Sequence, residues 1–201
     1  MDKRKEEIIE VATRRFCHYG FSKTTMNEIA EDLRITKANL YYYYQDKSAL
    51  IKDVICRVSD ILLKSEQQLL AQTNKDFLGT LFALLELRAS HMRTYYILYI
   101  NENLDWIKGI EIGDFIDKIK LRDSQLLKGV IQEFVDNGEL FLNDLDEAVE
   151  TYTDIIRGVG FMHTAHDVVT GIPNPANVDK ILASQKRVTK LIFEDKIVTK
   201  K

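Results

Sequence analysis

Residues 24–47 read TTMNEIAEDLRITKANLYYYYQDK. Thr25 stands three residues before Glu28, which is the spacing of a capping box at the start of a helix. The apolar pattern breaks at Arg34, and Thr36 can cap a second short helix that runs through Tyr44. Two short helices joined by a tight turn, with a longer helix in front of them, predict a helix-turn-helix unit.

The segments on both sides of this stretch are also predicted to be helical. Apolar residues from Lys3 to Tyr19 recur at helical spacing up to Gly20, and Asp46 can cap a long helix that ends near Ala71. Further helices are predicted at about 75–91, 93–105, 114–136, 146–170 and 176–196. The fold class is therefore predicted as all-α, with a three-helix head at residues 1–47 and a larger helical body at residues 48–201.

Composition agrees with long helices, because the 201 residues include only nine Gly and two Pro. Both prolines fall within residues 171–175, which are predicted as a loop, and Asn137-Gly138 is predicted to end a helix. Charges near the N-terminus leave no room for the apolar part of a signal peptide, and no apolar run approaches the roughly 18 residues that span a bilayer. We therefore expect a cytoplasmic protein without a membrane segment.

Cys17 and Cys56 lack the spacing of a metal or redox site, so both are expected to be buried thiols. The net charge of −3 does not by itself indicate nucleic-acid binding. Residues 1–47, however, carry nine Lys and Arg against eight Asp and Glu, whereas the remainder carries 19 against 23. The head is thus slightly basic and the body acidic.

The run Tyr41–Tyr44 is the most informative feature of the head. Successive helical residues point about 100° apart, so four consecutive rings cannot all enter one core. We expect Leu40 and Tyr44 to point inward, Tyr41 and Tyr43 outward, and Tyr42 to lie at the rim. Outward tyrosines beside Lys37 and Asn39, with the small Ala38 between them, suit a helix that enters the major groove of DNA. The alternative is a solvated helix with exposed tyrosines.

These residues resemble the head of the TetR/AcrR family of bacterial transcriptional regulators over residues 5–55. The matching motifs are Gly20-Phe21, Thr24-Thr25-Met26, Ile29-Ala30, Ile35-Thr36-Lys37 and Leu40-Tyr41-x-Tyr43-Tyr44-x-Asp46-Lys47. The resemblance implies an all-helical homodimer whose heads bind double-stranded operator DNA and whose variable body binds a small molecule.

The resemblance also implies the DNA-binding residues, which are Thr25, Arg34, Thr36, Lys37, Asn39, Tyr41, Tyr43 and Lys47. Thr25 and Lys47 would contact phosphates, and Tyr41 and Tyr43 a phosphate or a thymine methyl. Thr36 and Lys37 would touch backbone or base edges, and Asn39 would read a base. For Lys47, an ordinary solvated lysine is the alternative.

One position departs from the family pattern. Arg34 stands where the family usually has glycine between the two short helices. A residue other than glycine with positive φ costs on the order of 1 kcal/mol. Either the turn is rebuilt, or Arg34 offsets its strain by reaching a phosphate.

The body is rich in aromatic residues, which indicates either a ligand pocket or only a packed core. Candidate pocket residues are His91, Tyr95, Tyr99, Asn101, Trp106, Phe134, Arg157, Phe161, Met162 and His163. His163, His166 and Asp167 lack a further evident ligand, so no metal and no cofactor is predicted. The last two helices are expected to dimerise through Gly158, Gly160 and an apolar stripe formed by Ile181, Leu182, Val188, Leu191 and Ile192.

The sequence thus predicts a ligand-responsive regulator, specifically a repressor that a small hydrophobic or amphipathic effector releases from a palindromic operator. Two alternatives stay open, a DNA-binding activator and a regulator whose body binds a protein partner. The motifs GxSxG, GxGxxG, HExxH and the P-loop are all missing from the sequence, so no enzymatic activity is predicted.

Overall fold

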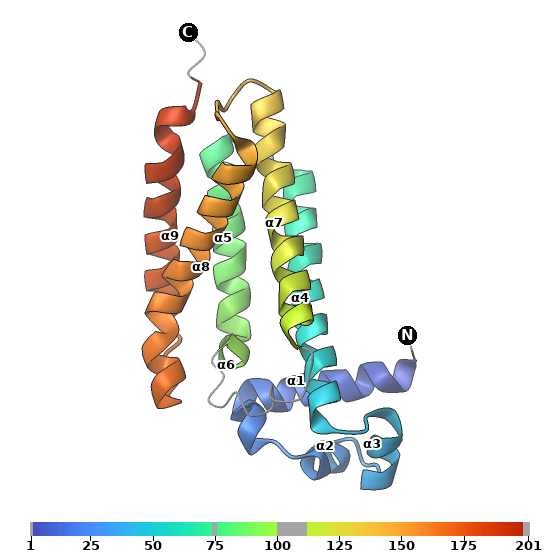
Figure 1. Cartoon of the computed structure of the whole chain (residues 1–201). Coiled ribbons are helices and arrows are strands. Elements are labelled where there is room, and N and C mark those ends of the chain that lie inside the picture. Colours follow the sequence, from blue (N-terminus) through green and yellow to red (C-terminus); the bar gives the residue numbers. More distant parts are fainter. Residues whose placement is uncertain (1, 74–75, 100–111, 199–201) are drawn as a thin grey trace. The chain divides into compact units, whose positions relative to one another are not determined.

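The computed structural model describes residues 2–73, 76–99 and 112–198, except for the side chains of 112–116. The described ranges are helical (Figure 1), and one isolated antiparallel bridge joins Leu140 to Ile197. The helices are α1 (Lys3–Lys23), α2 (Met26–Asp32), α3 (Lys37–Tyr43), α4 (Lys47–Gln72), α5 (Phe77–Thr94), α6 (Tyr96–Tyr99), α7 (Ile112–Asp136), α8 (Leu145–Thr170), α9 (Asn177–Phe193) and the short 3-10 helix η2 (Glu194–Lys196). The all-α prediction is confirmed.

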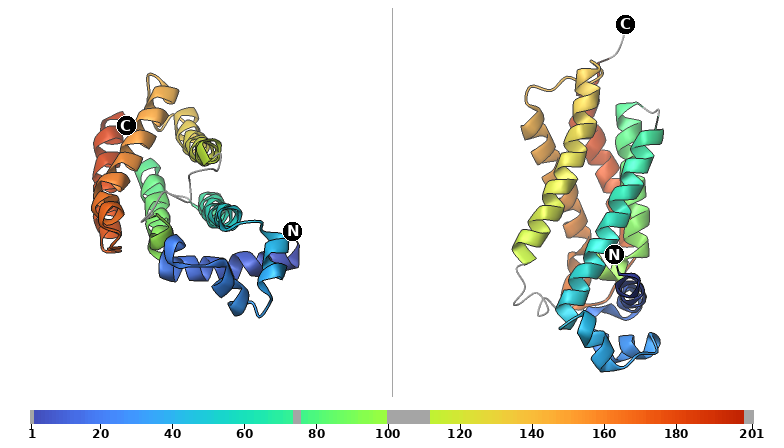
Figure 2. Two further views of the ribbon diagram at one scale, coloured as in Figure 1. Left: turned by 60° about the horizontal axis from the view of Figure 1, so that its bottom comes forward. Right: turned by 90° about the vertical axis from the view of Figure 1, so that its right-hand side faces the viewer.

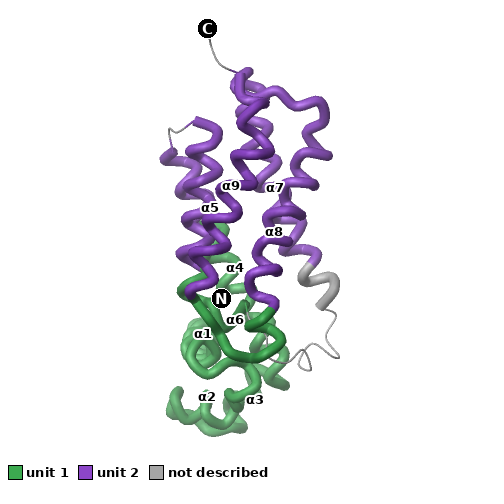
Figure 3. Tube along the Cα trace, turned by 90° about the vertical axis from the view of Figure 1, so that its left-hand side faces the viewer, with its two compact units in different colours: residues 1–64, 92–110, 166–175 green, residues 65–91, 111–165, 176–201 purple. Residues whose placement is uncertain are grey.

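The chain forms two compact units (Figure 3). Unit 1 comprises residues 1–64, 92–110 and 166–175, and unit 2 comprises residues 65–91, 111–165 and 176–201. Helices α4, α5 and α8 each contribute residues to both units. The functional division between residues 47 and 48 stays a prediction.

Unit 1 contains the three head helices and the first part of α4. In the views of Figures 1 and 2, α2 and α3 lie together on one side of α1. Its core includes Ile8 and Phe16 of α1, Ile29 of α2, Leu40 of α3 and Leu50 of α4, all fully buried. Amphipathic helices of this length are stable when their apolar faces pack together in this way.

Gly20 interrupts α1 rather than ending it. Its φ of 81° and ψ of 169° are not helical, and the chain resumes a helical path to Lys23. The Thr24 hydroxyl then donates a 2.9 Å hydrogen bond to the Gly20 carbonyl. The predicted break at Gly20 is therefore present, but the helix extends one turn beyond the predicted end.

Unit 2 has a separate aromatic core. The Phe77 ring lies 5.3 Å from that of Phe134 and 5.1 Å from that of Phe193, both in edge-on geometry. Tyr152 packs 5.1 Å from Phe193, and its hydroxyl lies 2.8 Å from the Thr189 hydroxyl. The α7 end follows the predicted Asn137-Gly138 signal, because Gly138 has φ 71° and its amide bonds the carbonyl of Val135.

Three sequence expectations need correction. The start of the predicted helix at 93–105 is wrong, because α5 continues to Thr94 and a separate helix, α6, covers Tyr96–Tyr99. Residues 100–111 lie outside the described ranges. Most of the apolar stripe of α9 that was predicted to dimerise packs within unit 2 instead. Ile181 is 4% exposed, and Leu182, Val188 and Ile192 pack against the aromatic core of unit 2. Leu191 is exposed. An amphipathic helix needs its apolar face for its own bundle. Cys17 and Cys56 are half-buried rather than buried.

Helices long and apolar enough to cross a bilayer are absent from the part of the chain described here.

Candidate nucleic-acid interface

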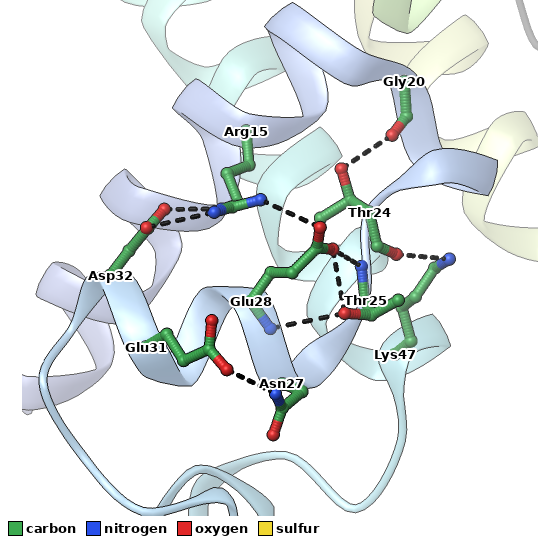
Figure 4. Close-up of polar contacts among 9 residues, drawn as sticks. All are labelled: Arg15, Gly20, Thr24, Thr25, Asn27, Glu28, Glu31, Asp32 and Lys47. Carbon is green, nitrogen blue, oxygen red and sulfur yellow. Dashed lines mark hydrogen bonds and ion pairs between the residues drawn. The ribbon is translucent and has the colours of Figure 1, made fainter.

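The start of α2 is fixed by the predicted capping box (Figure 4). The Glu28 amide donates to the Thr25 hydroxyl at 3.3 Å, and Glu28 Oε2 accepts both the Thr25 amide at 2.7 Å and the Thr25 hydroxyl at 2.8 Å. These bonds from the Thr25 amide and hydroxyl lower the pKa of Glu28. A DNA phosphate at Thr25 has to compete with Glu28 for the two donors, so the phosphate contact of Thr25 stays a prediction.

Arg15 of α1 binds both ends of α2, which the sequence analysis missed. Its Nε and Nη2 donate to the Asp32 carboxylate at 2.5 and 3.1 Å, and Nη1 lies 3.4 Å from Glu28 Oε1 (Figure 4). The bond from Arg15 lowers the pKa of Asp32. The guanidinium therefore sets how α2 lies on α1.

The turn between α2 and α3 is a Schellman motif with arginine in the place of glycine. The Ile35 amide bonds the Ala30 carbonyl at 3.0 Å, and the Arg34 amide bonds the Glu31 carbonyl at 3.0 Å. Arg34 has φ 53°, so it occupies the left-handed region that glycine normally takes. Of the two alternatives, the turn is kept rather than rebuilt, and the strain is local to Arg34. Its exposed side chain is available for DNA.

Helix α3 presents its polar side chains to solvent. The Thr36 hydroxyl accepts the Asn39 amide at 3.2 Å, as expected for a cap. Lys37 and Asn39 are exposed, and the Lys37 ammonium lies 5.7 Å from the centre of the Tyr41 ring. The Asn39 carboxamide has no hydrogen-bond partner among the described residues, so its donors and acceptor are free to pair with a base.

The tyrosine orientations are only partly as predicted. Leu40 and Tyr44 point inward, and the Tyr44 hydroxyl donates to Asp53 at 2.9 Å. Tyr42, predicted at the rim, is 83% exposed, whereas Tyr43, predicted outward, packs partly against the core. The reason is the helical angle: Tyr42 lies about 200° from Leu40, and Tyr43 only about 60°. Tyr41 is 38% exposed.

Lys47 at the start of α4 is already engaged inside the head. Its ammonium donates a 2.9 Å hydrogen bond to the Thr24 carbonyl (Figure 4), and burial lowers its pKa. The alternative of an ordinary solvated lysine is wrong. Asp46 caps the helix as predicted, since its carboxylate accepts the Ala49 amide at 2.8 Å.

The candidate pocket residues of the body that the structure describes are divided between the two units. Tyr95 and Tyr99 belong to unit 1, where Tyr95 lines a cleft of about 460 Å³ with Arg14, Cys17 and Arg57. Tyr99 is 45% exposed. Asn101 and Trp106 lie outside the described residues.

The other candidate pocket residues belong to unit 2. Phe134 is partly buried and packs against Phe77 at the core, and its assignment to a pocket stays a prediction. Phe161 and Met162 are 66% and 75% exposed, because they lie on the outer side of α8, and they are surface residues instead. His91 is buried, His163 Nε2 lies 3.3 Å from Ser184 Oγ, and Arg157 lines a second cleft, of about 540 Å³.

Comparison with known proteins agrees with the head geometry. Residues 8–54 match the family model for bacterial regulatory proteins of the tetR family. Residues 8–54 thus form a DNA-binding head of the tetR family. Over 145 residues, or 71% of this regulator and 70% of the relative, it is 25% identical to the HTH-type transcriptional repressor KstR2 of Mycolicibacterium smegmatis.

Two solved structures share the fold of the whole chain. A transcriptional regulator from Cytophaga hutchinsonii superposes with a TM-score of 0.86 at 24% identity, over 98% of this chain and 100% of that one. A putative transcriptional regulator from Saccharomonospora viridis, in complex with choline, gives a TM-score of 0.75 at 18% identity, over 96% and 98%. The prediction of a DNA-binding transcriptional regulator rather than an enzyme is confirmed.

Proposed function

We propose that this regulator is a ligand-responsive repressor whose head reads operator DNA through α3. The observation that carries the proposal is the exposed Asn39 carboxamide, which has no partner in the described structure and lies next to the exposed Lys37. Asparagine pairs in bidentate fashion with adenine, which makes Asn39 the base-reading residue. Thr25, Arg34, Thr36, Lys37, Tyr41, Tyr43 and Lys47 complete the proposed DNA surface, and the exposed ring of Tyr42 joins it.

The repressor is proposed to act as a homodimer through α8 and α9. Phe161, Met162 and Leu191 on these helices are 66%, 75% and 83% exposed in the single chain. A Cβ added at Gly158 or Gly160 would meet no atom of the chain within 4 Å. The close helix approach predicted at these glycines is therefore proposed to involve a helix of the partner subunit. A dimer places two recognition helices about 34–36 Å apart, one turn of DNA, and favours a palindromic operator. If analytical ultracentrifugation finds only a monomer at micromolar concentration, the proposed dimer with two heads on a palindromic operator is contradicted.

An effector bound in the body is proposed to shift the dimer towards a head spacing that does not fit the operator. Coupling free energies of this kind are typically about 1–3 kcal/mol. The relative complexed with choline supports a small-molecule effector, and the relative named as a repressor supports the sign of regulation.

The deciding experiment is a fluorescence-anisotropy titration of the protein against the DNA that flanks its own gene, at two salt concentrations. Tight binding to one palindromic segment, with affinity falling steeply with salt, supports the proposal. Equal binding to that segment and to a scrambled duplex at both concentrations contradicts it. A reporter placed behind the bound segment separates the repressor from the alternative activator. Mass spectrometry of the purified protein tests the other alternative, a body that binds a protein partner. A co-purified protein, rather than a co-purified small compound, would support that alternative.

A further inference from the structure

A polar cleft lies between α7 and α8 in unit 2. It has a volume of about 540 Å³ and is lined by Ser124 and Gln125 of α7 and by Glu150, Thr153, Asp154 and Arg157 of α8, among others. The two helices run antiparallel (Figure 1). Asp123 precedes Lys128 along α7, whereas Arg157, the partner of Asp123, follows Asp146, the partner of Lys128, along α8. We call this site the α7–α8 cleft.

The charges of the cleft leave an excess of negative groups. Both cations in its wall are engaged: Lys128 pairs with Asp146, and Arg157 donates to Asp123 and to the Lys120 carbonyl, each at 3.0 Å. Glu150 and Asp154 have neither an ion pair nor a side-chain hydrogen bond with any described residue. They stand four residues apart, so they lie on one face of α8 about 6 Å apart along its axis.

Thr153 adds an independent indication of a ligand. The residue is only 2% exposed and lines the cleft, yet its hydroxyl has no hydrogen-bond partner in the described structure. Buried hydroxyls are nearly always paired, because an unpaired one loses its hydration without compensation. A ligand with an N–H donor in the cleft can supply the missing partner.

A chain of ion pairs leads from the cleft to α4. Asp123 binds both Arg157, at 3.0 Å, and Arg88, at 2.5 Å, and Arg88 binds Glu66 of α4 at 2.6 Å. Glu66 is 4% exposed, and burial raises its pKa, a shift that Arg88 opposes. The Asp123 carboxylate is thus shared by Arg157 and Arg88, and Arg88 continues the chain of ion pairs to Glu66.

We propose that the α7–α8 cleft binds a small aliphatic diamine or a similar organic dication, with its ammonium groups on Glu150 and Asp154 and one N–H on the Thr153 hydroxyl. The inference rests on the proposed function in one respect, namely that this ligand is the effector. The Arg157–Asp123–Arg88–Glu66 chain then couples the cleft to α4, which also contributes residues to unit 1.

The binding test is isothermal titration calorimetry of the full chain with 1,4-diaminobutane, with butane-1,4-diol as the neutral control at matched ionic strength. We expect saturable binding of the diamine in the millimolar range or tighter, and none of the diol. The Glu150→Gln and Asp154→Asn double variant should lose affinity about tenfold or more, and Thr153→Val several-fold. Glu147→Gln, on the same helix but outside the cleft lining, is the matched control and should bind as the wild type does.

Wild-type affinity in the double variant, or no saturable binding to the wild type, overturns the site. Unchanged affinity together with raised thermal stability in Thr153→Val overturns the role of the hydroxyl. Coupling is tested separately by adding the diamine to the protein–operator complex: release from the wild type but not from the double variant supports the effector role, and binding without release overturns it. Calorimetry does not require DNA, so a failure of operator binding counts against the proposed function and not against the site.

Discussion

The ammonium of Lys47 donates a 2.9 Å hydrogen bond to the carbonyl of Thr24, which joins the start of α4 to the residue before the α2 cap. Lys47 has three donors, and this bond uses one of them. The residue can therefore position the Thr25 cap and bind a phosphate at the same time.

Lys47→Met tests both roles, because it keeps the apolar stem and removes the ammonium. We expect a loss of stability of about 1 kcal/mol in urea unfolding, since the Thr24 carbonyl loses its partner. Binding should weaken for all DNA sequences, and the slope of log K against log salt should fall by about 0.9. A salt slope equal to that of the wild type would restrict Lys47 to the positioning role.

Arg34→Gly is expected to stabilise the head by about 1 kcal/mol, because glycine adopts the observed φ of 53° without strain. The same change removes a charge, so DNA affinity should fall uniformly across sequences. Arg34→Lys is the control that keeps the charge and the strain, and it should change neither property greatly. Urea unfolding and anisotropy measure the two effects, and a glycine variant less stable than the wild type would refute the strain.

Asn39→Ala is expected to relax base preference at one operator position, at a cost of about 1–3 kcal/mol for the cognate base. Asn27→Ala is the matched control, because Asn27 is also exposed in the head but already donates to Glu31 at 2.6 Å. Anisotropy against single-base variants of the operator measures the effect. Equal losses for cognate and scrambled DNA would remove Asn39 from base reading.

The α2 cap should make the head sensitive to acid. The bonds from the Thr25 amide and hydroxyl lower the folded pKa of Glu28 below its ordinary value of 4.5. The stabilisation that the ionised Glu28 carboxylate provides is fully present above the pKa of Glu28 in the unfolded chain. It is lost as the pH falls through the lower pKa of Glu28 in the folded protein. Thermal unfolding between about pH 6 and pH 3 should therefore show a smaller decline in Glu28→Gln, which can keep the capping box without the titration. Parallel declines in both proteins would argue against the assignment.

The Cys17 thiol is expected to react slowly with alkylating agents. Burial raises its pKa to about 11 from an ordinary value of 9.0, which lowers the thiolate fraction at neutral pH about 100-fold. Alkylation by iodoacetamide at about pH 8, followed by mass spectrometry of the Cys17 peptide, should thus be about 100-fold slower in the native protein than in urea. Similar rates in the two states would show that the folded protein does not protect the thiol.

The head could be predicted from sequence because its signals are local. The Thr25–Glu28 box, the Thr36 and Asp46 caps and the turn at Arg34 each involve residues within about five positions, so the backbone pattern itself specifies them. The same locality exposes the error at Tyr42 and Tyr43, where the angle from Leu40 already distinguishes the outward ring from the packed one.

Local patterns were therefore enough to predict the helical class and the helix-turn-helix. The ion pairs between distant residues depend instead on how the helices pack: Arg15 pairs with Asp32, 17 residues away, and Arg88 pairs with Asp123, 35 residues away. Helix packing also places Phe134 against the core, leaves Phe161 exposed, and packs most of the α9 stripe within unit 2. Periodicity tells which face of a helix is apolar, but a side chain's partner depends on how separate helices pack, and that information is not local to any segment.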